Sequence, residues 1–293
     1  MSSLGTIVDM VLKCLPVPVA LKFARGRTRI SRHLPDNIQT SIDYYYGDFR
    51  INVDTNYPVE REMISGNYEP LLTRILESVI TCGSVCIDIG ANVGALTLVM
   101  SKLTGPSGIV YAFEPGPSTF NRLQANIVLN KLTNVTPVRV GLGERKEVLG
   151  WRMDRLNPGN AGLTRGAEFD ELIDVTTLDS FIESQSVQSV DLLKVDVEGM
   201  EFPVFLGGQK TLETFRPTIL LETLQTSREK RLQEGNDLYT QMEAFLRRTG
   251  YLLFRIDGDG RCRETSLQNT SEDTLAIHST RRSVLEKFQF YSG

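Results

Sequence analysis

The sequence is poor in the side chains that bind transition metals or form disulfides. It has four cysteines and two histidines in 293 residues, and no two cysteines form a C-x-x-C pair. Zinc sites usually draw on closely spaced Cys and His residues, and disulfide-stabilised domains carry more cysteine. We therefore expect reduced thiols and a cytoplasmic protein. No metal is predicted in the site, and a divalent cation held by carboxylates stays an alternative.

The sequence also lacks an apolar run of the roughly 18 residues that a membrane-spanning helix needs. Residues 7–23 are fairly apolar, but Asp9 and Pro16 are among the residues that interrupt them. No positively charged segment precedes them, so they make a poor signal peptide. Basic residues follow as far as Arg32. We expect this arm to pack on the domain or to fray; contact of residues 7–32 with a membrane surface, serving a lipid-linked substrate, is the alternative.

There is no surplus of positive charge. The formal net charge is −4, whereas a general nucleic-acid binder usually carries a basic excess. This balance excludes DNA as an expected partner. The basic stretch at residues 22–32 keeps methylation of RNA ribose open as an alternative.

From residue 84 onward, short apolar runs alternate with helical patterns. Repeated units of this kind predict a doubly wound α/β fold with a mostly parallel seven-stranded sheet and helices on both faces. A β-hairpin is expected at residues 41–54, and a helical pattern at 60–80 is broken by Pro70. We divide the chain into an N-terminal arm with the hairpin, residues 1–58, and a main domain, residues 59–293. The seven strands are expected at residues 85–89, 109–113, 135–140, 191–195, 218–222, 251–256 and 274–277.

Ligands of such sheets bind at the carboxyl ends of the strands. The segment from Asp88 to Gly94 follows the first strand, where glycine permits a tight turn and a helix amino end offers free N–H groups. Glu114 follows the second strand, where a carboxylate can accept both hydroxyls of a ribose. A dinucleotide site needs a second glycine where this sequence has Asn92. S-adenosylmethionine has no pyrophosphate, so we predict it rather than a nicotinamide cofactor.

Carboxylates also follow the fourth and fifth strands. Lys194 and Asp196 lie two residues apart and point to the same side of a strand. They form either an ion pair that stabilises the strand end, or a site in which Asp196 faces the reacting group. Carboxylates on one rim suit proton removal from a hydroxyl, or binding of a divalent metal. The predicted catalytic residues are Asp196, Glu222, Lys194 and Glu198.

Seven segments, in this order and spacing, resemble motifs of the FkbM-type methyltransferase family. They match its V-D-I-G-A-N-x-G, F-E-P, L-x-x-N-I-x-L-N, T-L-D, K-I-D-V-E-G-x-E, R-P-x-I-x-x-E and G-Y-x-L-F elements. The likeness runs from about residue 48 to residue 277. One departure is Gly141-Leu142-Gly143, where the family usually has A-L-S or A-L-G. The segments are residues 86–94, 113–115, 123–130, 177–179, 194–201, 216–222 and 250–254.

The resemblance implies a class I, Rossmann-like methyltransferase that uses S-adenosylmethionine to methylate a hydroxyl of a small molecule, sugar or glycan. It places Asp196 beside the reacting methyl group and Glu114 on the ribose. Besides the RNA and lipid-linked substrates, the alternatives are a nicotinamide oxidoreductase and a non-catalytic cofactor-binding scaffold. The acceptor pocket is expected between the N-terminal arm, the loop at 157–162 and the late strands. The predicted cofactor-binding residues are Asp88, Gly90, Asn92, Gly94, Glu114, Pro115, Leu142 and Asp196.

Overall fold

A computed structural model spans the chain, and its description covers most of the residues from 31 to 290. Glu198 and residues 157–161 lie outside the described part, as do most of residues 7–30. The membrane-surface contact suggested for residues 7–32 therefore stays a prediction. None of the described helices is long and apolar enough to cross a membrane. The described residues are 12, 15, 20, 22, 24, 31–66, 68–152, 162–197, 199–222, 238–257, 261–267 and 273–290.

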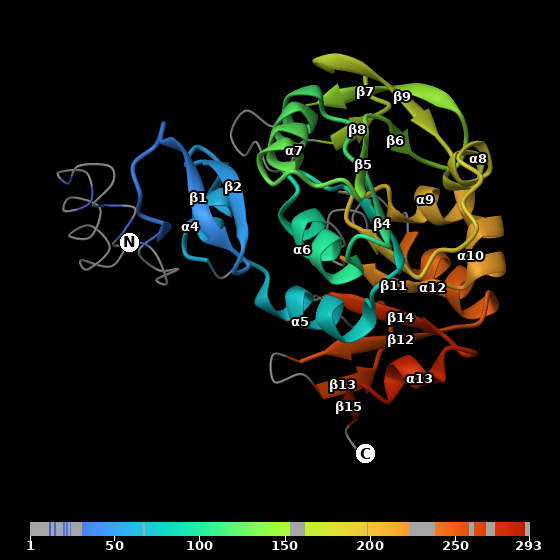
Figure 1. The fold of residues 1–293 in the computed structure, drawn as a ribbon. Coiled ribbons are helices and arrows are strands. Elements are labelled where there is room, and N and C mark those ends of the chain that lie inside the picture. The colour runs from blue at the N-terminus through green and yellow to red at the C-terminus, as the bar shows by residue number, and fades with distance from the viewer. Residues whose placement is uncertain are drawn as a thin grey trace.

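The main sheet has the predicted doubly wound arrangement (Figure 1). It contains five adjacent parallel strands, β5 (Val135–Val138), β4 (Ile109–Phe113), β3 (Val85–Ile89), β10 (Leu192–Val195) and β11 (Thr218–Leu221). Beside β11, β14 (Thr274–His278) and β12 (Tyr251–Ile256) pair antiparallel. Two strands absent from the prediction, β13 (Arg261–Glu264) and β15 (Gln289–Phe290), extend the sheet to nine among the described residues. The segment Arg261–Glu264 was missed because its single apolar residue, Cys262, gives no alternating pattern. In spatial order the strands are β15 (Gln289–Phe290), β13 (Arg261–Glu264), β12 (Tyr251–Ile256), β14 (Thr274–His278), β11 (Thr218–Leu221), β10 (Leu192–Val195), β3 (Val85–Ile89), β4 (Ile109–Phe113) and β5 (Val135–Val138).

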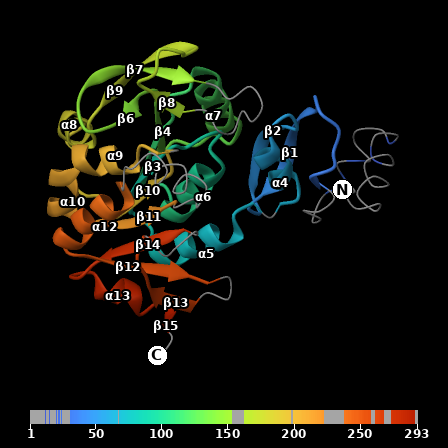
Figure 2. The same ribbon diagram turned by 180° about the vertical axis from the view of Figure 1, so that it is seen from behind.

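Helices cover both faces of this sheet (Figures 1 and 2). Successive residues of a strand point to opposite faces, so Cys86 of β3 packs into one apolar core and Ile87 into the other. The first core includes α5 (Pro70–Val79), α6 (Ala95–Thr104) and α7 (Pro117–Leu129). The second includes α8 (Leu178–Ser184), α9 (Glu201–Gly207), α10 (Gln209–Phe215) and α12 (Leu238–Arg248). A short helix, α13 (Arg282–Leu285), lies beside β14.

Two smaller elements accompany the main sheet. The predicted hairpin is present as β1 (Gln39–Tyr45) and β2 (Phe49–Asp54), and α4 (Pro58–Ile64) packs on it. A second sheet, which the sequence did not predict, follows β5 along the chain. It pairs β6 (Gly141–Leu142), β9 (Glu171–Thr176), β7 (Glu147–Arg152) and β8 (Gly162–Thr164) in that order. The division of the chain at residues 58 and 59 stays a prediction.

Candidate active site

The turn after β3 brings the chain very close to β10. Gly90 has φ +78°, and a Cβ on it would lie 1.8 Å from the carbonyl oxygen of Asp196. Asn92 also has a positive φ, of 52°, a conformation that asparagine tolerates better than most residues. These two residues therefore shape a turn whose backbone faces open space at the carboxyl edge of the sheet.

Glu114 stands at the end of β4 and is fixed by this turn. Its Oε2 accepts a hydrogen bond from the Asn92 N–H at 3.0 Å, and its Oε1 accepts one from the Gly116 N–H at 2.9 Å. Burial raises the pKa of Glu114 to about 7, although the two N–H donors oppose the shift. Each oxygen of a carboxylate has a further lone pair, so Glu114 can accept two hydroxyl groups from a ligand.

Lys194 lies beneath the turn and joins three backbone and side-chain groups. Its Nζ donates to the Gly90 carbonyl oxygen at 2.8 Å and to Asp196 Oδ2 at 3.2 Å. It also lies 3.4 Å from Asp88 Oδ1. Burial alone would lower the pKa of Lys194, but the surrounding carboxylates raise it above its usual range. The Lys194–Asp196 pair expected from the strand spacing is thus present, and Lys194 holds the rim together.

Asp88 points away from the space where a ligand would lie. Its side chain is buried, and Oδ2 accepts a hydrogen bond from Thr97 Oγ1 at 2.6 Å. Gly94, also expected to bind the cofactor, is the N-cap residue directly before α6, and a Cβ on it would lie 2.7 Å from Leu123 Cδ1. Both residues therefore support the turn from within the core.

Asp196 and Glu222 meet at the rim because their strands are neighbours. The Asp196 N–H donates to the Ile89 carbonyl oxygen, and the Glu222 N–H donates to the Val195 carbonyl oxygen, each at 3.1 Å. The two carboxyl groups are hydrogen-bonded to each other. Two carboxylates in contact cannot both ionise readily, so one of them keeps a proton.

The surroundings of the pair favour the proton on Glu222. Burial, the hydrogen bond to Asp196 and the negative charge of Asp196 together raise the pKa of Glu222 to about 10, in that order of size. Burial also opposes ionisation of Asp196, yet Lys194 and Glu222 hold the pKa of Asp196 below its ordinary value. Asp196 is therefore an anion that a protonated neighbour and a cation stabilise. Glu198, the fourth predicted catalytic residue, lies outside the described residues.

A cavity opens over this rim, and six of the eight predicted cofactor-binding residues line it. The late strands β12 and β14, which we expected to shape the acceptor pocket, do not line it. The six residues are Gly90, Asn92, Glu114, Pro115, Leu142 and Asp196.

Several cavity-lining residues had no signal in the sequence analysis. They come from the N-terminal part, from α7 and from the second sheet, and include Tyr57, Glu60, Arg122, Trp151 and Leu163. Trp151 lies so close to Gly116 that a Cβ there would be 2.6 Å from Trp151 Cζ2. Trp151 is the single tryptophan of the sequence, and this was the sequence feature that could have indicated a role for it in the site. Tyr57, Glu60, Trp151 and Leu163 lie outside the seven motifs, and Arg122 directly precedes a motif to which no role in the site was assigned, so spacing alone could not place these residues in the site.

The strand order, the glycine turn after β3 and the acidic residue after β4 define a class I methyltransferase. A family model described as "Methyltransferase FkbM domain" matches residues 88–253, more than half of the chain. The chain belongs to this family. The resemblance stated from the motifs is thereby confirmed.

Two curated relatives are similar over part of the chain. Methyltransferase 1 of Beauveria bassiana is 32% identical in an alignment of 145 residues that covers 42% of this chain and 58% of that protein. Hexuronic acid methyltransferase AglP of Haloferax volcanii is 31% identical over 129 residues, which is 43% of this chain and 51% of that protein. The chain thus spans little more than half the length of these relatives. A solved structure of methyltransferase FkbM from Methylobacillus flagellatus aligns with a TM-score of 0.44 and 17% identity, covering 75% of this chain and 54% of that one.

Proposed function

We propose that this protein is an S-adenosylmethionine-dependent O-methyltransferase whose acceptor is a hydroxyl group of a small molecule, sugar or glycan. The observation that carries the proposal is the pair of carboxylates on one cavity, Glu114 and Asp196, each fixed by its own hydrogen bonds. Membership of a methyltransferase family supports the reaction type. Similarity to a hexuronic acid methyltransferase supports a sugar acceptor.

The cavity residues fit the proposed cofactor. Glu114 would hold the ribose hydroxyls, Leu142 would contact the adenine, and the Gly90–Asn92 turn would hold the methionine part. Acidic side chains on the wall attract a sulfonium cation, since opposite charges stabilise one another most where water is scarce. S-adenosylmethionine supplies an electrophilic methyl group when it is bound.

Asp196 is the group proposed to take the hydroxyl proton of the acceptor. It lines the cavity, whereas its partner Glu222 does not. A hydroxyl becomes strongly acidic as its oxygen gains a methyl group, so a carboxylate with a low pKa is basic enough to accept the proton. Lys194 and the proton on Glu222 keep Asp196 ionised and oriented before reaction. Positioning of the two reactants and exclusion of water supply the remaining acceleration.

Calorimetric titration of the full chain with S-adenosylhomocysteine tests the cofactor, with NAD as the competing nucleotide. We expect binding of the nucleoside, loss of that binding in Glu114→Ala and no binding of NAD. Binding of NAD alone would establish the oxidoreductase alternative, and binding of neither would leave the scaffold alternative.

Asp196→Asn tests the acceptor chemistry. Once an acceptor is found among hexuronic acids and other hydroxyl compounds, we expect turnover to fall about 100-fold or more, the range for loss of a general base. Binding of S-adenosylhomocysteine should change far less. Unchanged turnover would make Asp196 a structural residue, and loss of activity with a chelator would favour the metal-assisted alternative.

The free thiols of Cys82, Cys86 and Cys262 support the proposal that the enzyme acts in the cytoplasm.

A further inference from the structure

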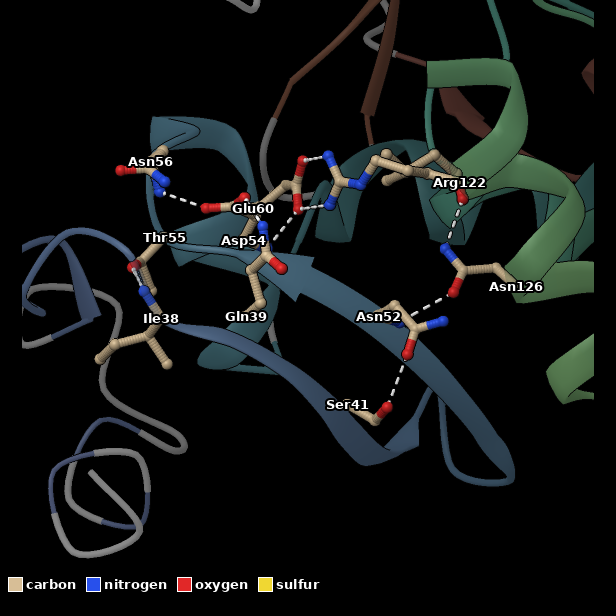
Figure 3. Close-up of polar contacts among 11 residues, drawn as sticks. Ile38, Gln39, Ser41, Asn52, Asp54, Thr55, Asn56, Glu60, Arg122 and Asn126 are labelled. Carbon is tan, nitrogen blue, oxygen red and sulfur yellow. Dashed lines mark hydrogen bonds and ion pairs between the residues drawn. The ribbon is translucent and has the colours of Figure 1, made fainter. Parts of the chain in front are cut away.

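Two side chains of α7 and the residue that directly follows this helix contact the N-terminal unit, which we define as residues 38–66 with β1, β2 and α4. Arg122, Asn126 and Asn130 are spaced four residues apart, so they follow one another along the same side of the helix. Figure 3 shows Arg122 and Asn126 directed from α7 toward this unit. Asn126 and Asn130 belong to the L-x-x-N-I-x-L-N motif, to which the sequence analysis assigned no role.

The two asparagines bind the free edge of β2. Asn126 Oδ1 accepts a hydrogen bond from the Asn52 N–H at 2.8 Å, while its Nδ2 donates to the Val93 carbonyl oxygen at 2.8 Å. Asn130 Oδ1 accepts from the Arg50 N–H at 2.8 Å, and its Nδ2 donates to the Arg50 carbonyl oxygen at 2.6 Å. An edge strand has unpaired backbone groups on its outer side. The side-chain amides of Asn126 and Asn130 bond such backbone groups of β2 on the side where a third strand would otherwise pair.

Arg122 binds the unit through α4. It forms a two-point ion pair with Glu60, in which Nη1 donates to Oε1 at 2.6 Å and Nη2 donates to Oε2. The Glu60 side chain is 3% exposed and also accepts the Asp54 N–H at 2.6 Å. The Arg122 guanidinium lies 5.0 Å from the centre of the Tyr57 ring. A paired arginine of this kind fixes orientation as well as distance.

The same contacts shape the candidate active site, because residues 57–60 and Arg122 line the cavity that holds Glu114 and Asp196. We propose that Arg122, Asn126 and Asn130 are positioning residues that dock the N-terminal unit as one wall of the cofactor cavity. A ligand in the cavity then stabilises the docked unit, since two events that favour the same state strengthen each other reciprocally. This inference rests on the proposed function for the identity of the ligand.

Hydrogen exchange followed by mass spectrometry on the full chain tests the proposal, with S-adenosylhomocysteine as the probe. In the unsubstituted protein we expect the probe to slow exchange at residues 38–66 as well as at 89–94. Without the probe, Asn130→Ala should speed exchange at 38–66 by about fivefold for each of the two hydrogen bonds to Arg50 that it removes. Arg122→Met should speed it by about 100-fold, because Glu60 is left buried without its partner. Asn121→Ala is the control, since Asn121 is exposed on the same helix.

The outcomes separate this inference from the proposed function. Protection of residues 89–94 with none at 38–66 would overturn the inference, because the unit would then be no part of the site. Unchanged exchange at 38–66 in Asn130→Ala would overturn it as well, and that variant loses no ion pair and should fold. Absence of protection anywhere would refute the proposed cofactor instead, while the exchange rates of the variants would still report whether α7 holds the unit.

Discussion

Replacing Lys194 with methionine removes the cation that Asp88 and Asp196 share. The Lys194 side chain is 7% exposed and that of Asp88 is 1% exposed, so water cannot take the place of the ammonium group. Breaking a buried ion pair by removing one partner costs about 3–5 kcal/mol of unfolding free energy. The Gly90 carbonyl oxygen also loses its donor. We therefore expect the unfolding midpoint to fall by roughly 6–10 °C, taking about 2 °C per kcal/mol for a chain of this size.

Urea unfolding with linear extrapolation measures this loss directly. Lys146→Met is the matched control, because Lys146 is exposed, and its loss should stay within about 0.5 kcal/mol. Adding Asp88→Asn to Lys194→Met should restore about half of the stability, since the buried charge is gone while the Gly90 carbonyl still lacks a donor. A loss in Lys194→Met that is no larger than in Lys146→Met would refute the reasoning, because Lys194 would then not compensate buried charge.

Three further predictions concern the same rim. Gly90→Ala should lower the urea midpoint of unfolding more than Gly66→Ala does. Both glycines have a positive φ, but a Cβ on Gly66 meets nothing within 4 Å, whereas one on Gly90 would meet the Asp196 carbonyl oxygen. Equal losses would contradict this close approach to Asp196. The pKa of Glu222 is raised from 4.5 to about 10 in the folded protein. Between about pH 5 and pH 9 the folded state therefore keeps a proton that the unfolded chain has lost, so the free energy of unfolding of the unsubstituted protein should fall as pH rises through this range. Glu222→Gln should flatten that dependence, and an unchanged slope would place the proton elsewhere. Affinity for S-adenosylhomocysteine should rise as pH increases through about 7, the pKa of Glu114, because hydroxyl donors bind the ionised carboxylate better than the protonated one. In calorimetric titration, Glu114→Gln should bind more weakly and show no such dependence on pH.

The sequence was sufficient for seven of the nine strands described in the main sheet and for the turns that follow the parallel ones. The strands at residues 85–89 and 109–113 have the predicted bounds, because buried strands of a parallel sheet are continuous apolar runs between breakers. Since parallel strands end at the same edge, the motifs also indicated that Asp196 and Glu222 share a rim, and their backbone and carboxyl contacts agree with this. The second sheet was missed because β6 and β8 have only two and three residues, and the apolar residues of the six-residue strands β7 and β9 neither alternate strictly nor form a continuous run.

The tertiary structure decided which of the motif residues face the cavity. Asp88 and Gly94 lie in the same motif as Gly90, yet the Asp88 side chain is buried and bonded to Thr97, and Leu123 fills the space where a side chain on Gly94 would lie; a motif carries no information about such contacts. The tertiary structure also brought in residues from outside the motifs, as in the pairing of Glu60 with Arg122, which are 62 positions apart. Local patterns of apolar residues, glycine and proline fix strands and turns because those depend on neighbours along the chain. The walls of the cavity depend on contacts between distant segments, and these are set only when the elements pack together.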